Sequence, residues 1–309
     1  GYYVGRGIVQ DMDMNGDGVE DLLFEFASST NNNATSRIGL QYGGSVGTIA
    51  MASIDARWNT NTKTEHPTYE NLSQSGDMNN DGYDDWTFAD PLGDVTNTNS
   101  GSVYALWGQS SEYSSSGSSF TSAASTVAGA GKYEWGGYMV GIVPDMDGDG
   151  ADELGWWVRE FGELHILSGM DAASGGVHGT DDSLAVLGFS SSSTPGFVRS
   201  IGDWDGDGNS EWVYVGDGSS GSTAGRVYVF PGTGLSGEVS GEEAVLASFK
   251  ASNDDYNGDF GESMLTADMD GDGLNDWVIG DPEWEGDLNG DGTEDAEAGA
   301  VFLFMNSGI

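Results

Sequence analysis

Six short acidic stretches carry the residues with the clearest chemistry in this chain of 309 residues. The stretch from Asp145 to Glu153 reads DMDGDGADE, with Asp at positions 1, 3 and 5, Gly at position 6 and an acid at position 9. In a tightly turned loop, alternate side chains direct their oxygen atoms to a common centre, and glycine at position 6 permits the turn. Position 7 can add its main-chain carbonyl. Such a loop predicts an oxygen-rich metal site.

The other five stretches repeat the pattern, with Asp or Asn at positions 1, 3 and 5 and an acid at position 9. At positions 1, 3, 5, 7 and 9 the predicted metal ligands are Asp13, Asn15, Asp17, Val19 and Asp21; Asp77, Asn79, Asp81, Tyr83 and Asp85; Asp145, Asp147, Asp149, Ala151 and Glu153; Asp203, Asp205, Asp207, Asn209 and Glu211; Asp268, Asp270, Asp272, Leu274 and Asp276; and Asp287, Asn289, Asp291, Thr293 and Asp295.

The donor set selects among metals. Hard oxygen ligands favour Ca²⁺ over zinc or copper, and Mg²⁺ demands a stricter octahedron, so we expect about five or six calcium ions. The alternative is that these stretches are ordinary Asp, Asn and Gly turns between strands. Six copies of one donor pattern favour the metal. In the first stretch Asp11 offers a competing register, but it places Val19 at position 9, so Asp13 is taken as position 1.

The charge of the chain limits its partners. Nine Lys and Arg face 51 Asp and Glu, a formal net charge of -42. There is no basic patch to neutralise phosphates, which argues against nucleic acid and anionic membranes as partners. Bound divalent cations would offset the repulsion among the acids. Adaptation to a saline habitat is another reading of the acidity, compatible with the first.

Two absences from the sequence exclude further classes. The chain has no cysteine, so it forms no disulfide, thiolate metal site or cysteine nucleophile. It also has no run of about 20 apolar residues that could insert into a membrane. Because 37% of residues are hydrophobic and ten are Trp, we expect a folded protein in spite of the charge.

The acidic stretches recur with a regular period. Five of them begin at residues 13, 77, 145, 203 and 268, so the steps are 64, 68, 58 and 65 residues. The sixth follows after 19 residues and is interpreted as an extra site within the last repeat. Periods of this order are typical of propeller blades. We therefore predict one domain over residues 1–309, with approximate repeats 1–52, 53–128, 129–188, 189–250 and 251–309.

Short runs of β-branched and aromatic residues flank each acidic stretch and predict strands. A strand is expected after each stretch, a second beyond a turn, a third after a Ser/Gly-rich segment and a fourth leading into the next stretch. The Ser-rich segment 110–125 is expected to be a loop between blades. The fold class is therefore an all-β propeller of four-stranded blades, five of them visible, which form either a five-bladed ring or part of a larger one. The expected strands are 21–26, 37–42, 48–51, 85–88, 101–107, 154–158, 163–167, 184–187, 211–215, 225–230, 244–249, 260–265, 276–279 and 299–304.

These features resemble the FG-GAP repeat family, the calcium-binding blades of integrin α-subunit propellers and their bacterial relatives. Phe260-Gly261 matches the FG element, and Ile279-Gly280-Asp281-Pro282 and Phe88-Ala89-Asp90-Pro91 match GAP loosely, with Asp in place of Ala. The first repeat has Val4-Gly5 at the FG position, and the third has Gly137-Tyr138. The resemblance implies calcium sites in loops on one face of a propeller and an extracellular adhesive or recognition role. Integrin-type propellers have seven blades, whereas five repeats are visible here.

The leading function is thus a calcium-binding, secreted or surface-exposed propeller that serves as an adhesion, ligand-binding or structural module. Its expected partner is a protein or glycan of unknown identity. The last repeat ends after its third strand, at Phe304, so we expect either that the native chain continues or that a strand from another segment or subunit pairs there. The alternative is a calcium-dependent carbohydrate-active enzyme, either a polysaccharide lyase or a hydrolase.

Catalytic residues are not evident. His165 lies in a predicted strand and is expected to be structural, while His66 and His178 lie in loops without a visible partner. Trp residues that directly follow the closing acid, such as Trp277, are expected to pack within blades. Trp58 and Trp284 lie in irregular segments, where an exposed indole would suit a sugar or protein ligand.

Overall fold

The computed structural model describes most of the chain. The regular secondary structure of its described residues is almost entirely β, with twenty strands, one short helix, α1 (Gly169–Ala173), and one 3-10 turn, η2 (Thr180–Asp182). The described residues are 3–9, 12–27, 36–45, 47–50, 52–59, 75–94, 97–119, 125–128, 131–189, 195–217, 225–250, 260–261, 263–282, 284, 293 and 299–306.

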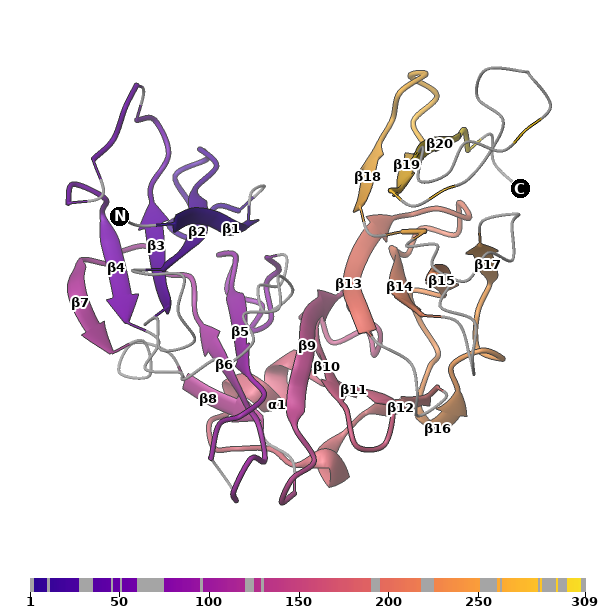
Figure 1. Cartoon of the computed structure of the whole chain (residues 1–309), viewed down its shortest axis with the longest axis horizontal. Coiled ribbons are helices and arrows are strands. Elements are labelled where there is room, and N and C mark those ends of the chain that lie inside the picture. The colour runs from indigo at the N-terminus through magenta and orange to yellow at the C-terminus, as the bar shows by residue number, and fades with distance from the viewer. Residues whose placement is uncertain are drawn as a thin grey trace.

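The strands form five small sheets, one for each repeat, which follow one another along an arc (Figure 1). The first sheet has the order β1 (Tyr3–Val9), β2 (Leu22–Ala27), β3 (Ser36–Gln41), β4 (Ala56–Asn59) and β7 (Ser115–Ser119). The second contains β5 (Trp86–Asp90), β6 (Ser102–Leu106) and β8 (Ser125–Ala128). The predicted all-β, five-bladed propeller is confirmed.

The remaining three sheets make blades three to five. Blade three runs β16 (Gly237–Ser240), β12 (Ala185–Gly188), β11 (Glu163–Leu167), β10 (Glu153–Val158) and β9 (Gly136–Val143). Blade four runs β13 (Pro195–Gly202), β14 (Glu211–Asp217), β15 (Gly225–Phe230) and β17 (Ala247–Lys250). Blade five runs β18 (Ser263–Ala267), β19 (Asp276–Asp281) and β20 (Ala300–Phe304).

One predicted strand was wrong. Residues 48–50 are not extended into a ladder, and the strand that pairs with β3 is β4. Gly44 and Gly47 lie at φ 79° and 97°, which breaks the extended path after β3. Pairing resumes where Trp58 can enter the core, at 1% exposure. The prediction of an exposed, ligand-stacking indole at Trp58 is therefore also wrong.

The Ser-rich segment between blades is not wholly a loop, as the sequence had suggested. Its residues Ser115–Ser119 form β7, which pairs in parallel with β4 and so extends the first blade with a strand from the second repeat. The same arrangement recurs when β16, from the fourth repeat, pairs in parallel with β12 of blade three. Neighbouring blades are therefore joined by main-chain hydrogen bonds as well as by side-chain packing.

Hydrophobic cores lie between consecutive blades. We call the face of a sheet that packs on the next blade its trailing face, and the opposite face its leading face. The core between blades four and five joins Val227 and Val229 on a trailing face to Phe260, Met264 and Trp277 on a leading face. Three equivalent cores join the other successive pairs. Packing between faces is therefore the unit that repeats.

Tryptophans fill these cores, as predicted for those after the closing acid. Trp86, Trp212 and Trp277 are at most 1% exposed. Strand alternation sends Trp156 and Trp157 to opposite faces of β10, yet both are buried, because they enter two different inter-blade cores.

Close approach between blades requires glycine at one point. Gly101 has φ 80°, and a Cβ there would overlap the Gly136 carbonyl of the next blade. We expect Gly101→Ala to destabilise the protein by about 3 kcal/mol, from left-handed strain plus overpacking. Gly44→Ala is the matched control, since φ is 79° and no atom lies within 4 Å, and it should cost only about 1 kcal/mol. Urea unfolding measures the free energy of unfolding of both variants. Equal losses of stability would contradict the predicted steric overlap between a Cβ at residue 101 and the Gly136 carbonyl.

A buried carboxyl at the end of β5 should make the stability of the protein depend on pH. Burial raises the pKa of Asp90 from 3.8 to about 6, partly offset by the N–H bond from Leu92. The folded protein favours the protonated form of Asp90. Its contribution to stability is therefore fully present below pH 4 and is lost as the pH rises through 6. Asp90→Asn should therefore stabilise the protein by roughly 2 kcal/mol at pH 8 and leave it unchanged at pH 4. Exposed Glu160→Gln is the control, and a pH-independent effect would refute the prediction.

Candidate metal centres

Five of the six acidic stretches lie within the described residues. We call them loop 1 (13–21), loop 2 (77–85), loop 3 (145–153), loop 4 (203–211) and loop 5 (268–276). Loops 1, 3, 4 and 5 lead into the second strand of their blades, and loop 2 leads into β5, the first strand of its sheet in the described residues. Of the sixth set, Asp287, Asn289, Asp291 and Asp295 lie outside the described residues, and only Thr293 is described.

The side chain at position 1 organises each loop. In loop 3, Gly148 N–H and Asp149 N–H donate to Asp145 Oδ1 at 2.7 and 3.1 Å, and Gly150 N–H donates to Oδ2 at 3.0 Å. Both carboxylate oxygens are therefore fixed by the turn that follows them. Bonds of the same kind hold Asp13, Asp77, Asp203 and Asp268.

Positions 3 and 5 are held in the same manner. Asp149 N–H donates to Asp147 Oδ1 at 3.1 Å, and Ala151 N–H donates to Asp149 Oδ1 at 2.9 Å. The corresponding two bonds recur in the other four loops. The alternating donors are thus orientated by the main chain, which lowers the cost of assembling a cation site.

The closing acid at position 9 is buried and joins two parts of its blade. In loop 2, Met78 N–H donates to Asp85 Oδ2 at 2.9 Å, and Gly108 N–H, beyond β6, donates to Oδ1 at 2.7 Å. Asp21, Glu211 and Asp276 make equivalent pairs of bonds. All five closing acids are at most 2% exposed. The acid is therefore a structural link as well as a predicted ligand.

Loop 3 differs from this pattern at its closing acid. Glu153 is fully buried, and its Oε2 accepts a bond from Met146 N–H at 2.8 Å. Its other oxygen, Oε1, is buried and has no hydrogen-bond partner. A buried carboxylate oxygen left in this state is costly, and a cation would compensate it. Burial, followed by the charges of Asp147, Asp145 and Asp149, raises the pKa of Glu153 to about 8.

Three loops bring carboxylate oxygens together within 4.8 Å. Loop 3 assembles the largest set, Asp145, Asp147, Asp149 and Glu153. Loops 4 and 5 each assemble positions 1, 3 and 9, which are Asp203, Asp205 and Glu211, and Asp268, Asp270 and Asp276. In loops 4 and 5 the predicted ligands at position 5, Asp207 and Asp272, are not in these groups. The residues of loop 3 fit a hard cation best.

Loops 1 and 2 carry Asn at position 3, Asn15 and Asn79, and so offer fewer charges. Burial raises the pKa of Asp85 to about 8 and also raises that of Asp21. A cation bound beside either carboxylate would favour its charged form.

Sequence reasoning missed the role of position 8. Asp84 Oδ2 accepts a bond from Asp13 N–H of the preceding loop at 2.7 Å, and Asp152 Oδ2 accepts one from Asp77 N–H at 3.1 Å. In loop 5, Asn275 Nδ2 donates to the carbonyl of Ile201 at 2.9 Å. Loop 1 is therefore linked to loop 2 and loop 2 to loop 3, and loop 5 is tied to the strand that precedes loop 4. The signal was a polar residue at every position 8.

Position 4 was also missed. Its φ is 71° at Gly16 and 80° at Gly148, and loop 2 has Asn80 there with φ 54°. Only Gly and, at some cost, Asn adopt this region readily. The restriction to Gly or Asn at position 4 was visible in the sequence.

The histidines do not build a second site among the described residues. His165 contacts Ser183 Oγ at 3.0 Å and Glu163 Oε2 at 3.2 Å, and burial lowers its pKa to about 4. His178 lies 3.7 Å from Asp182. His66 lies outside the described residues.

Comparisons with known proteins give matches among solved structures alone. No protein-family model matches the chain, and no curated protein matches it. Among solved structures, the chain is similar to the crystal structure of BBS1N in complex with ARL6DN, soaked with lead, at 10% identity and a TM-score of 0.37. The match covers 98% of this chain and 76% of that chain. None of the helices in the described residues is long and apolar enough to cross a membrane.

Proposed function

We propose that this protein is a calcium-binding propeller of the FG-GAP type that works outside the cell as a ligand-binding, adhesion or structural module. The carboxylates of loops 3, 4 and 5 would hold the ions. The observation that carries the proposal is Glu153, fully buried with one unpartnered oxygen, beside three carboxylates whose oxygens lie within 4.8 Å.

The role of the ion would be mechanical and electrostatic. A bound Ca²⁺ supplies positive charge where several carboxylates meet, and it would hold the loops rigid on one rim of the propeller. Position 8 would pass that rigidity to the next loop, since Asp84 and Asp152 are bonded to the main chain of the preceding loop. A rim of fixed loops is suited to binding a protein or glycan.

The test is a count of ions by equilibrium dialysis, with Ca²⁺ and Mg²⁺ compared at equal concentration. We expect at least three calcium ions per chain, one for each of loops 3, 4 and 5, and weaker retention of Mg²⁺. Asp147→Ala should remove one ion, whereas Asp181→Ala, outside the loops, should remove none. Calcium retained equally by the Asp147 variant, or no retained calcium, would overturn the proposal.

A further inference from the structure

The trailing face of blade five is uncovered. Main-chain pairing of Trp212 with Phe230 and of Trp277 with Phe304 puts Val301 and Leu303 at the places that Val227 and Val229 hold in blade four. Val227 and Val229 are fully buried against the next blade. Val301 and Leu303 are 73% and 57% exposed. This face therefore has the residues of an inter-blade core without the blade that completes it.

The leading face of blade one is exposed at Ile8 and Leu22, whereas Phe24 and Phe26 on the same face are 7% and 2% exposed. Ile8 pairs with Phe24 as Met264 pairs with Ile279, and Leu22 follows its closing acid as Trp277 does. Met264 and Trp277 are 8% and 1% exposed in their core. Ile8 and Leu22 are 59% and 41% exposed. The two ends of the arc thus carry the two halves of one repeated interface.

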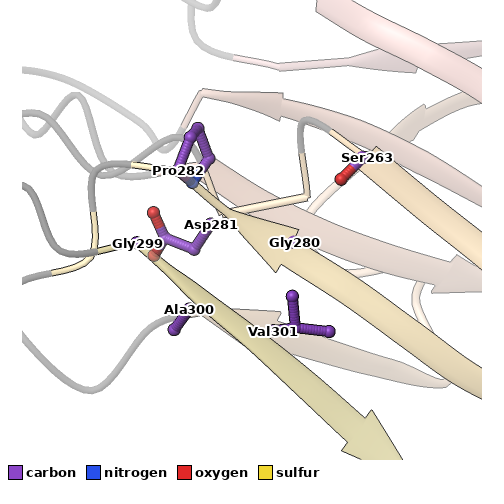
Figure 2. Close-up of a pocket in the computed structure, with 7 residues that line it drawn as sticks. All are labelled: Ser263, Gly280, Asp281, Pro282, Gly299, Ala300 and Val301. Carbon is purple, nitrogen blue, oxygen red and sulfur yellow. The ribbon is translucent and has the colours of Figure 1, made fainter. Parts of the chain in front are cut away.

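A pocket lies on blade five, beside the end of β19 and the start of β20. It has a volume of 380 Å³ and is lined mainly by Gly280, Asp281, Pro282, Gly299, Ala300 and Val301 (Figure 2). The corresponding residues of blade two are 89–91 and 101–103, since Pro91 and Gly101 stand as Pro282 and Gly299 do.

In blades two and four, the corresponding place is filled by the next blade. Gly137 of blade three packs there so closely that a Cβ would lie 2.9 Å from Ala89 Cβ and 3.2 Å from Val103 Cγ2. Gly261 of blade five packs in the same way, and its Cβ would lie 2.8 Å from Val215 Cγ1 and 3.0 Å from Val227 Cγ2. Both glycines have positive φ. In both blades the occupant is therefore a glycine of the following blade that lies at or just before the start of its first strand, β9 or β18.

We infer that a second copy of this chain fills this pocket, with blade one of the second copy packing on blade five of the first. Blade one carries Val4-Gly5 at the place of Phe260-Gly261 in the sequence. Its Glu20, exposed at position 8, stands where Asp84 and Asp152 bond to the preceding loop. The contact continues the interface that the chain already makes four times between its own blades.

Such a contact is head to tail: it joins the trailing face of blade five in one copy to the leading face of blade one in the next. Each bound copy leaves one free face at each end of the assembly, so further copies can bind there. The net charge of -42 opposes association at low salt. At about 0.15 M salt the Debye length falls to about 8 Å, and the apolar contact can dominate.

Sedimentation velocity at that salt, with calcium present, tests the inference. The protein should form dimers and larger species as its concentration rises. Val301→Asp and Ile8→Asp should each weaken association by about tenfold or more, because each buries a charge in an apolar contact. Val177→Asp is the control, an exposed valine, 45% accessible, away from both end faces.

A mixture of the two variants gives the decisive result. The Val301 variant keeps an intact leading face and the Ile8 variant an intact trailing face, so the mixture should form one-to-one dimers that do not extend. A wild-type protein that stays monomeric at every concentration, as an intramolecularly closed ring would, overturns the inference. So does a mixture that fails to pair. Ion counts on the same samples report separately on calcium binding.

Discussion

Removal of calcium with a chelator is expected to lower the melting temperature of this protein by roughly 10–20 °C. A site filled at 100 times its dissociation constant adds about 2.7 kcal/mol to stability, so three sites add about 8 kcal/mol. For a chain of this size each kcal/mol corresponds to about 2 °C. The physical cause is the cost of gathering the loop carboxylates, most of all in loop 3, without a compensating cation.

Differential scanning calorimetry with Ca²⁺, Mg²⁺ and EDTA at fixed ionic strength measures this effect. Fixed ionic strength matters because general screening of a charge of -42 also stabilises the compact state. Mg²⁺ should restore only a small part of the loss. If Mg²⁺ and Ca²⁺ raise the melting temperature equally, the effect is screening and the loops are acidic turns.

The effect of Glu153→Gln on the stability of the protein should change sign when calcium is removed. With calcium present, the variant lacks one of the proposed calcium ligands of loop 3 and should be about 3 kcal/mol less stable. With EDTA present, it should be at least as stable as the wild type. Glutamine keeps an oxygen that can accept the Met146 N–H, and it removes a carboxyl group whose charged form is buried without a compensating partner.

Chemical unfolding with and without calcium measures this reversal, with exposed Glu243→Gln as the matched control. If Glu153 served only as a structural link, the loss would be equal in both conditions. That outcome would separate loop 3 from calcium binding, even if the other loops bind metal.

Most of the fold could be predicted because each repeat contains the same local signals. Strands after the closing acids begin at or one residue beyond these acids, and the Trp that follows in three repeats is buried as expected. The strand at Ala56–Asn59 was missed because glycines shift it beyond the expected spacing. Pairing of β7 and β16 with the preceding blade was not predictable, since neither short strand carries a periodic apolar signal.

The residues of the candidate site could be predicted from the sequence, but the hydrogen bonds between them could not. Alternation at positions 1, 3 and 5 is local and was visible in the sequence. The bond from Asp77 N–H to Asp152 spans 75 residues, and a contact at that separation leaves no local pattern. Nor could the sequence show that Glu153, alone of the five described closing acids, keeps an oxygen without a partner.

The strands that cross between blades also affect how the protein can be dissected. Because β4 and β7 both lie within the predicted second repeat, 53–128, but belong to the sheet of blade one, excision of that repeat would remove two strands from a neighbour that stays behind. The same holds for the fourth repeat and blade three, through β16. The smallest unit that can be removed while the neighbouring sheets stay complete is therefore larger than one repeat. We expect gain or loss of single blades in related chains to be rare at these two junctions.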